Sequence, residues 1–166
     1  MKRLQLILTI ATVTAMMACA QKANHQPSAT TTEAALAEKV ETTSVTAGKV
    51  NKISQDEFAR LVADYKTEEW KFVGKRPAII DFNATWCAPC RRLAPILEEL
   101  AAQYNGRIDF YAVDVDENPE LAQAFGIQSI PMMLFCPVDN EPQGFTGLHP
   151  KEDIEEAIDA IFWGKK

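Results

Sequence analysis

The sequence predicts an α/β domain in which a central mixed β-sheet carries helices on both faces. Between residues 50 and 162, short apolar runs alternate with amphipathic segments in the order β-α-β-α-β-α-β-β-α. The run 78–82 is apolar apart from Asp81, which is typical of a strand buried on both faces of a sheet. Residues 50–166 amount to about 117 residues, near the usual size of one domain. We therefore expect a single domain over 50–166.

Strands are expected at 50–53, 78–82, 108–115, 132–136 and 144–148, and helices at 54–65, 88–104, 118–125 and 151–162. Ser54 and Glu57 have the spacing of a capping box, which opens the first helix. The second helix places Leu93, Leu97 and Leu100 on one face. These local signals set the order of the elements.

Residues 1–20 have the layout of an export signal. A positive start is followed by an uncharged, mostly apolar stretch over 4–17, too short for a comfortable membrane span of about 20 residues. Residues 18–20, Ala-Cys-Ala, fit a secretory cleavage site. Met16 to Cys19 also resembles a lipoprotein box, in which Cys19 would be acylated. We favour the lipoprotein and expect a protein anchored in the cell envelope, facing the periplasm, over a freely soluble periplasmic one.

Residues 21–49 are predicted to form a flexible linker. They contain no aromatic residue and few large aliphatic ones, so they bury too little apolar area to offset the entropy of ordering. Such a segment would tether the domain to a bilayer. The net charge of −6 and the absence of a basic stripe argue against a nucleic-acid surface.

Cys87 and Cys90 are the predicted redox pair, in the run Trp-Cys-Ala-Pro-Cys over 86–90. Cys87 falls where a buried strand turns into a helix, and the free N–H groups and dipole of a helix start favour a thiolate. Cys90 lies three residues on, on the same helical face, close enough to form a disulfide. Pro89 suits the first helical turn. We expect Cys87 to attack disulfides and Cys90 to resolve the product.

The alternatives for this pair are a structural disulfide or half of a zinc site. Zinc needs four ligands, and no second C-x-x-C or suitable His pair accompanies the first, so no metal is expected. A purely structural bond that closes so short a loop would stabilise the fold little. No cofactor is implied, because the dithiol is itself the redox group. Cys136 is expected to be a small buried hydrophobic residue.

Three stretches, 81–95, 126–131 and 145–147, together resemble the thioredoxin family. The resemblance implies the thioredoxin fold and a protein-disulfide reductase. It implies that Pro131 is a cis-proline beside the disulfide and that Ile130 presents its backbone to an extended substrate. Gly147 would let the substrate approach closely. Trp86, Ala88 and Pro89 would complete the substrate-binding residues.

Asp81 matches the family's buried acid. A carboxylate among Ile79, Ile80 and Phe82 should be desolvated, which raises its pKa and suits it to exchange a proton with Cys90. The alternative is an Asp at a strand end that a neighbouring backbone group satisfies. The sequence departs from the family where Asn83 replaces an aromatic residue, Ala112 a lysine and Ala88 a glycine.

The leading functional hypothesis is a monomeric reductase that acts on disulfide-containing exported proteins and takes electrons from a membrane or soluble donor. The Ala-Pro dipeptide and Ile130 resemble the reducing branch more than oxidants such as DsbA. An oxidase or isomerase is the alternative within the same chemistry. A thioredoxin-fold binding module without catalysis is the alternative from another class.

Overall fold

The computed structural model of the 166-residue chain describes residues 45–67 and 69–164. The expected export signal over 1–20, with Cys19, and most of the expected linker lie outside the described residues. Within the linker's last residues, the side chain of Val45 is partly buried against the core, and the backbone N–H of Thr46 donates to Oδ1 of Asn51 at 2.8 Å. In the described ranges, no helix has the length and apolarity needed to cross a membrane.

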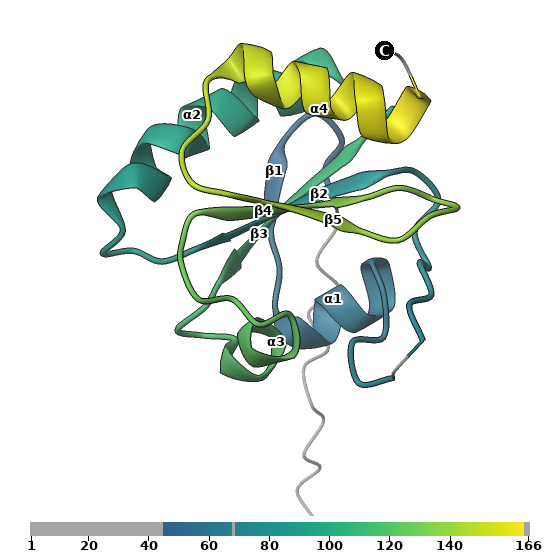
Figure 1. Cartoon of the computed structure of the whole chain (residues 1–166), viewed down its shortest axis with the longest axis vertical. Helices are drawn as coiled ribbons and strands as arrows, with labels where there is room; N and C mark the ends of the chain where they lie inside the picture. The colour runs from purple at the N-terminus through teal and green to yellow at the C-terminus, as the bar shows by residue number, and fades with distance from the viewer. Residues whose placement is uncertain (1–44, 68, 165–166) are drawn as a thin grey trace, which may run out of the picture. The chain divides into compact units, whose positions relative to one another are not determined.

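The described residues form a five-stranded mixed sheet in the order β1-β3-β2-β4-β5 (Figure 1). The strands are β1 (Val50–Lys52), β2 (Ala78–Asn83), β3 (Asp109–Asp114), β4 (Met132–Cys136) and β5 (Gln143–Thr146). The first three run parallel, whereas β4 pairs antiparallel with both β2 and β5. Strand β2 therefore lies at the centre, which explains its nearly continuous apolar sequence.

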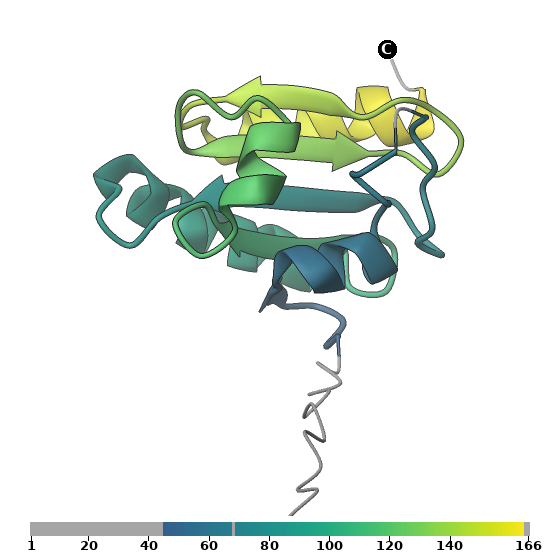
Figure 2. The same cartoon turned by 90° about the horizontal axis from the view of Figure 1, so that it is seen from below.

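Two helices cover each face of the sheet (Figures 1 and 2). Helices α2 (Ala88–Gln103) and α4 (Lys151–Trp163) pack on one face, and α1 (Gln55–Leu61) and α3 (Pro119–Ala124) pack on the other. Alternate residues of β2 divide between the two cores: Ile79 packs with α2 and α4, and Ile80 packs with α1 and α3. The predicted fold class is confirmed.

Helix α1 is shorter than its sequence predicts. Its capping box is present: Glu57 N–H donates to the Ser54 hydroxyl, and the Ser54 N–H donates to the Glu57 carboxylate. The helix ends at Leu61, however, and does not continue to Tyr65. Ala63 instead forms a β-bridge with Phe72, so the chain leaves the helix axis and the expected last turn is wrong.

Strand β5 is a short edge strand that contributes one aromatic side chain to the core. The rings of Phe145 and Phe135 lie 4.9 Å apart between centroids, which anchors the strand to β4. Gly147 follows with a φ of 103°, a conformation that favours glycine and ends the strand.

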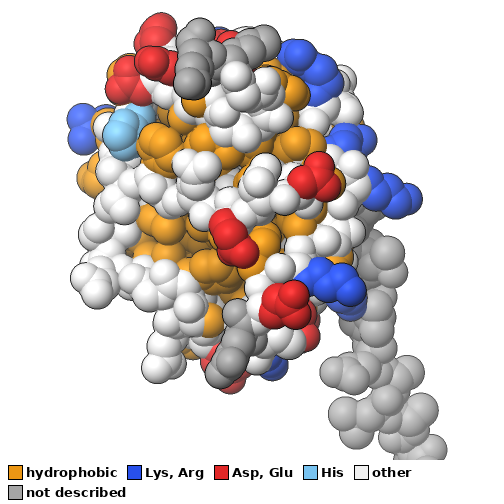
Figure 3. All heavy atoms as spheres, turned by 45° about the vertical axis from the view of Figure 1, so that its right-hand side comes forward, with side chains coloured by type: hydrophobic (Ala, Val, Ile, Leu, Met, Phe, Trp, Pro, Cys, Tyr) orange, Lys and Arg blue, Asp and Glu red, His pale blue; other side chains and the backbone are white. Residues whose placement is uncertain are grey.

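Hydrophobic side chains reach the surface between charged ones on one side of the domain (Figure 3).

Candidate active site

The junction between β2 and α2 carries the cysteine pair. Cys87 is the N-cap of α2, and its Sγ accepts a hydrogen bond from the backbone N–H of Cys90 at 3.2 Å. The two cysteines form a disulfide with their Cα atoms 5.3 Å apart, and Pro89 occupies the first helical turn. Both cysteines are buried, each 3% exposed. The predicted position of the pair at a helix start is confirmed.

Trp86 stands at the rim of the disulfide. It is 66% exposed, yet its indole Nε1–H donates to Oδ2 of Asp116 at 2.7 Å. This hydrogen bond ties the residue before Cys87 to the segment after β3. Asp116 was not singled out from the sequence, because a contact between residues 86 and 116 leaves no local pattern.

The loop before β4 faces the disulfide. The Ile130–Pro131 peptide bond is cis, as the resemblance to thioredoxins implies. Ile130 and Val115 pack, partly buried, against the cluster of Ala84 and the two cysteines. The backbone N–H of Gly147 donates to the carbonyl of Pro131 at 2.8 Å, which holds the β5 end beside this loop.

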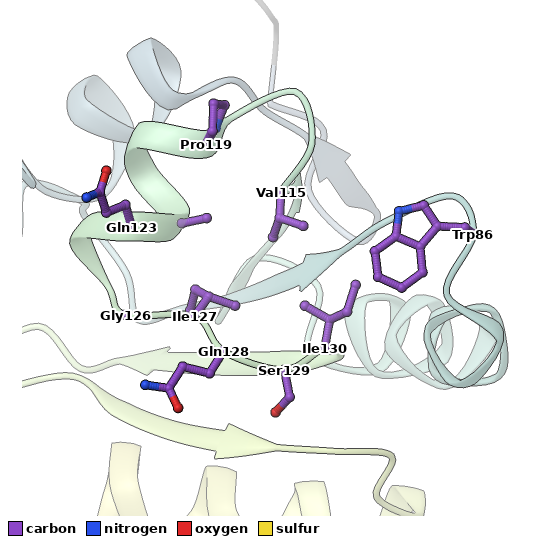
Figure 4. Close-up of a pocket in the computed structure, with 10 residues that line it drawn as sticks. Trp86, Val115, Pro119, Gln123, Gly126, Ile127, Gln128, Ser129 and Ile130 are labelled. Atoms are coloured by element: carbon purple, nitrogen blue, oxygen red, sulfur yellow. The ribbon is translucent and has the colours of Figure 1, made fainter.

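A groove of about 730 Å³ opens beside this site. In Figure 4, Trp86 lies on one side, α3 on the other, and Val115, Ile127 and Ile130 between them. The groove is lined largely by apolar side chains and by the backbone of the loop over 126–130. A concave apolar surface beside a reactive group is suited to hold an extended peptide.

Asp81 lies in the interior and does not line this groove. The residue is 4% exposed, and burial raises the pKa of its carboxyl group to about 6. A hydrogen bond from the Asn83 amide to Oδ2, at 3.1 Å, acts in the other direction and lowers the pKa. Oδ1 is buried and accepts no hydrogen bond from any residue that the structure describes.

Asp81 and Cys90 both line a second cavity, of about 460 Å³, whereas Cys87 does not. Ala112 is the register partner of Asp81 on β3 and also lines the cavity. This is the position at which the family usually carries a lysine. The second cysteine and a buried carboxyl group thus face the same cavity. A group of His, Cys, Asp or Glu that could hold a metal ion does not occur within the described ranges.

The remaining predicted residues fall into two groups. Ala88 is exposed and Pro89 half-buried at the start of α2, beside Cys87. Cys136 is a free thiol in β4, fully buried in the core with α1 and α3, and it takes no part in the site.

The comparisons with known proteins agree with this geometry. The family model for thioredoxin matches residues 49–160. The chain is 44% identical over 111 residues to a thioredoxin of Borreliella burgdorferi, covering 66% of this chain and 95% of that relative. It is 46% identical over 82 residues to a thioredoxin of Staphylococcus haemolyticus, covering 49% of this chain and 78% of the relative. The crystal structure of chloroplastic thioredoxin z is similar with a TM-score of 0.56 and 34% identity, covering 68% of this chain and 94% of that one.

A cysteine pair at a helix start, opposed by a cis-proline on a mixed sheet, defines a thiol–disulfide oxidoreductase. The chain belongs to the thioredoxin family.

Proposed function

We propose that this protein reduces disulfides of exported proteins, with Cys87 as the nucleophile and Cys90 as the resolving thiol. The observation that carries this assignment is the hydrogen bond from the Cys90 backbone N–H to Cys87 Sγ at the start of α2. Once the disulfide is reduced, this N–H and the helix dipole stabilise a thiolate on Cys87. Cys90 instead shares a cavity with Asp81, which suits the thiol that must lose a proton later.

The reaction proceeds through two exchanges. The Cys87 thiolate attacks one sulfur of the substrate disulfide, which forms a mixed disulfide and releases the other substrate sulfur as a thiolate. Cys90 then gives its proton to the carboxylate of Asp81 and attacks Cys87 Sγ. This step forms the Cys87–Cys90 disulfide and releases the second substrate sulfur. The substrate gains two electrons and the protein loses two.

The groove beside Trp86 is the proposed binding site for the substrate polypeptide. Ile130 offers backbone groups at the edge of β4, and Gly147 presents no side chain beside it. An extended segment that pairs with this loop would bring its disulfide to Cys87. Because the groove is apolar, unfolded or locally opened clients should bind better than compact ones.

Two features of the sequence support the reducing direction. The dipeptide between the cysteines is Ala-Pro and Ile130 precedes the cis-proline, and both resemble the reducing branch of the family.

The apolar leader over 4–17 and Cys19 support export and lipid anchoring, and an anchored reductase in an oxidising compartment needs an electron donor. Labelling with radioactive palmitate tests the anchor: the wild-type protein should be labelled and Cys19→Ala should not, and equal labelling would exclude acylation at Cys19.

Reduction of insulin by dithiothreitol tests the activity. The wild-type protein should accelerate the reaction and Cys87→Ser should not, whereas the matched control Cys136→Ala should keep full activity because Cys136 is remote from the site. No acceleration by the wild type would support a binding module. Faster oxidation of a reduced unfolded protein than reduction of insulin would support an oxidase.

A further inference from the structure

Asn83 is the polar side chain closest in sequence to Asp81 on the same strand. It is the last residue of β2 and is half-buried. Because side chains two residues apart point to the same face of a strand, Asn83 and Asp81 lie side by side. The Asn83 amide Nδ2 donates to Asp81 Oδ2 at 3.1 Å and to the Asp81 carbonyl oxygen at 3.1 Å. These two bonds fix the amide against the acid.

The cavity beside Asp81 holds several charged groups, but none is hydrogen-bonded to its carboxylate. Lys52 contributes from β1, Asp114 from β3, and Arg91 and Glu98 from α2. Lys52 Nζ forms an ion pair with Oε2 of Glu117 at 2.9 Å, and the side chain of Lys52 is 61% exposed. Its ion-pair partner is therefore Glu117 and not Asp81. From β4, the register partner of Asp81 is the apolar Met133. Among the described residues, Asn83 supplies the one hydrogen bond to this carboxylate.

We infer that Asn83 is a positioning residue for Asp81: its amide holds Oδ2 and leaves Oδ1 as the oxygen that accepts the Cys90 proton. The inference rests on the proposed role of Asp81 as proton acceptor. It follows from the unequal surroundings of the two oxygens, since Oδ2 is held at 3.1 Å and Oδ1 is buried with no hydrogen-bond partner among the described residues. The amide also opposes the effect of burial, because a hydrogen bond to a carboxylate favours its charged form. A lysine at position 112, beside Asp81 on β3, would act in the same direction, because a nearby positive charge also favours the charged carboxylate.

Asn83→Leu keeps the shape of the side chain and removes the donor. The expected effect appears in the resolving step, in which Cys90 attacks the mixed disulfide. Its rate is measured by stopped flow as the plateau rate at which the Cys87–Cys90 disulfide forms when a small disulfide substrate is saturating, from about pH 5 to pH 9. Without the donor, Asp81 ionises at higher pH, so the midpoint of the profile should rise by about one unit. The plateau rate near pH 6 should fall about fivefold, with less than a twofold change near pH 9.

Two comparisons separate positioning from mere structural support. Asn83→Gln retains an amide donor and should return the midpoint toward the wild-type value, and Asn140→Leu, in the exposed turn before β5, should leave it unchanged. The initial attack by Cys87, measured at limiting disulfide, should be the same in all variants. A rate reduced equally at every pH, or an unchanged midpoint in Asn83→Leu, would overturn the inference.

Asp81→Asn distinguishes the failure of this inference from the failure of the proposed function. If Asp81→Asn retains the wild-type profile, Asp81 is not the proton acceptor, and its proposed role and that of Asn83 both fail, whereas the proposed reductase activity stands or falls with the reduction of insulin. If Asp81→Asn abolishes the profile and Asn83→Leu does not move it, only the role of Asn83 is refuted. Should Asn83→Leu not fold, Asn83→Ala can be titrated instead, by following the Asp81 carboxyl carbon by NMR. The pKa of Asp81 must then be higher in Asn83→Ala than in the wild type, and an unchanged pKa would overturn the inference.

Discussion

The buried carboxyl group of Asp81 is expected to make the oxidised protein less stable at neutral pH than at acidic pH. Its ordinary pKa of 3.8 rises to about 6 in the folded protein, chiefly because burial removes its water. The folded state therefore binds this proton more tightly than the unfolded chain does. The resulting stabilisation is complete below about pH 4 and is lost as the pH rises through 6. A shift of about two units corresponds to about 3 kcal/mol.

Asp81→Asn removes the charge and keeps the shape, so it should unfold at higher urea concentration than the wild type. The difference in free energy of unfolding should be about 3 kcal/mol near pH 8 and about half of that near pH 5. The control Asp139→Asn, at an exposed turn, should not differ from the wild type at either pH. The reasoning is refuted if the difference is the same at both pH values, or if Asp81→Asn is the less stable protein near pH 8.

Three further experiments, two of them on substituted proteins, test other parts of the molecule. Reduced Cys90→Ser should remain joined to insulin through Cys87 as a mixed disulfide on a non-reducing gel, and a product free of insulin would contradict the assigned order of attack. Burial raises the pKa of the Cys136 thiol, so a thiol reagent should label it only after denaturation; rapid labelling of the native protein would contradict its burial. Phe135→Ala should lower the free energy of unfolding, measured in urea, by about 3–5 kcal/mol because it leaves a cavity between the sheet and α4. A loss below about 1 kcal/mol would contradict this expectation and mean that neighbouring side chains fill the cavity.

The order of the elements and the place of the dithiol were predictable because their signals are local. The apolar run of β2, the proline in the first turn of α2 and the spacing of the cysteines all lie within 78–90. The cis bond before Pro131 was implied by the family resemblance and not by any physical feature of the sequence.

Features that depend on contacts between distant residues were not predictable in the same way. Val62 and Tyr65 continue the helical period of α1, yet the bridge between Ala63 and Phe72 ends the helix earlier. Asn83 was recognised as a departure from the family, but its hydrogen bond to Asp81 depends on how the amide is oriented within the folded strand.

The equilibrium reduction potential of the Cys87–Cys90 pair, titrated against glutathione or dithiothreitol, tests the proposed reductase most directly. A potential near that of thioredoxin, about −270 mV, is the predicted result, and it would require a donor of electrons to the protein. A potential near that of DsbA, about −120 mV, would make the protein an oxidant and contradict the proposed direction of electron flow.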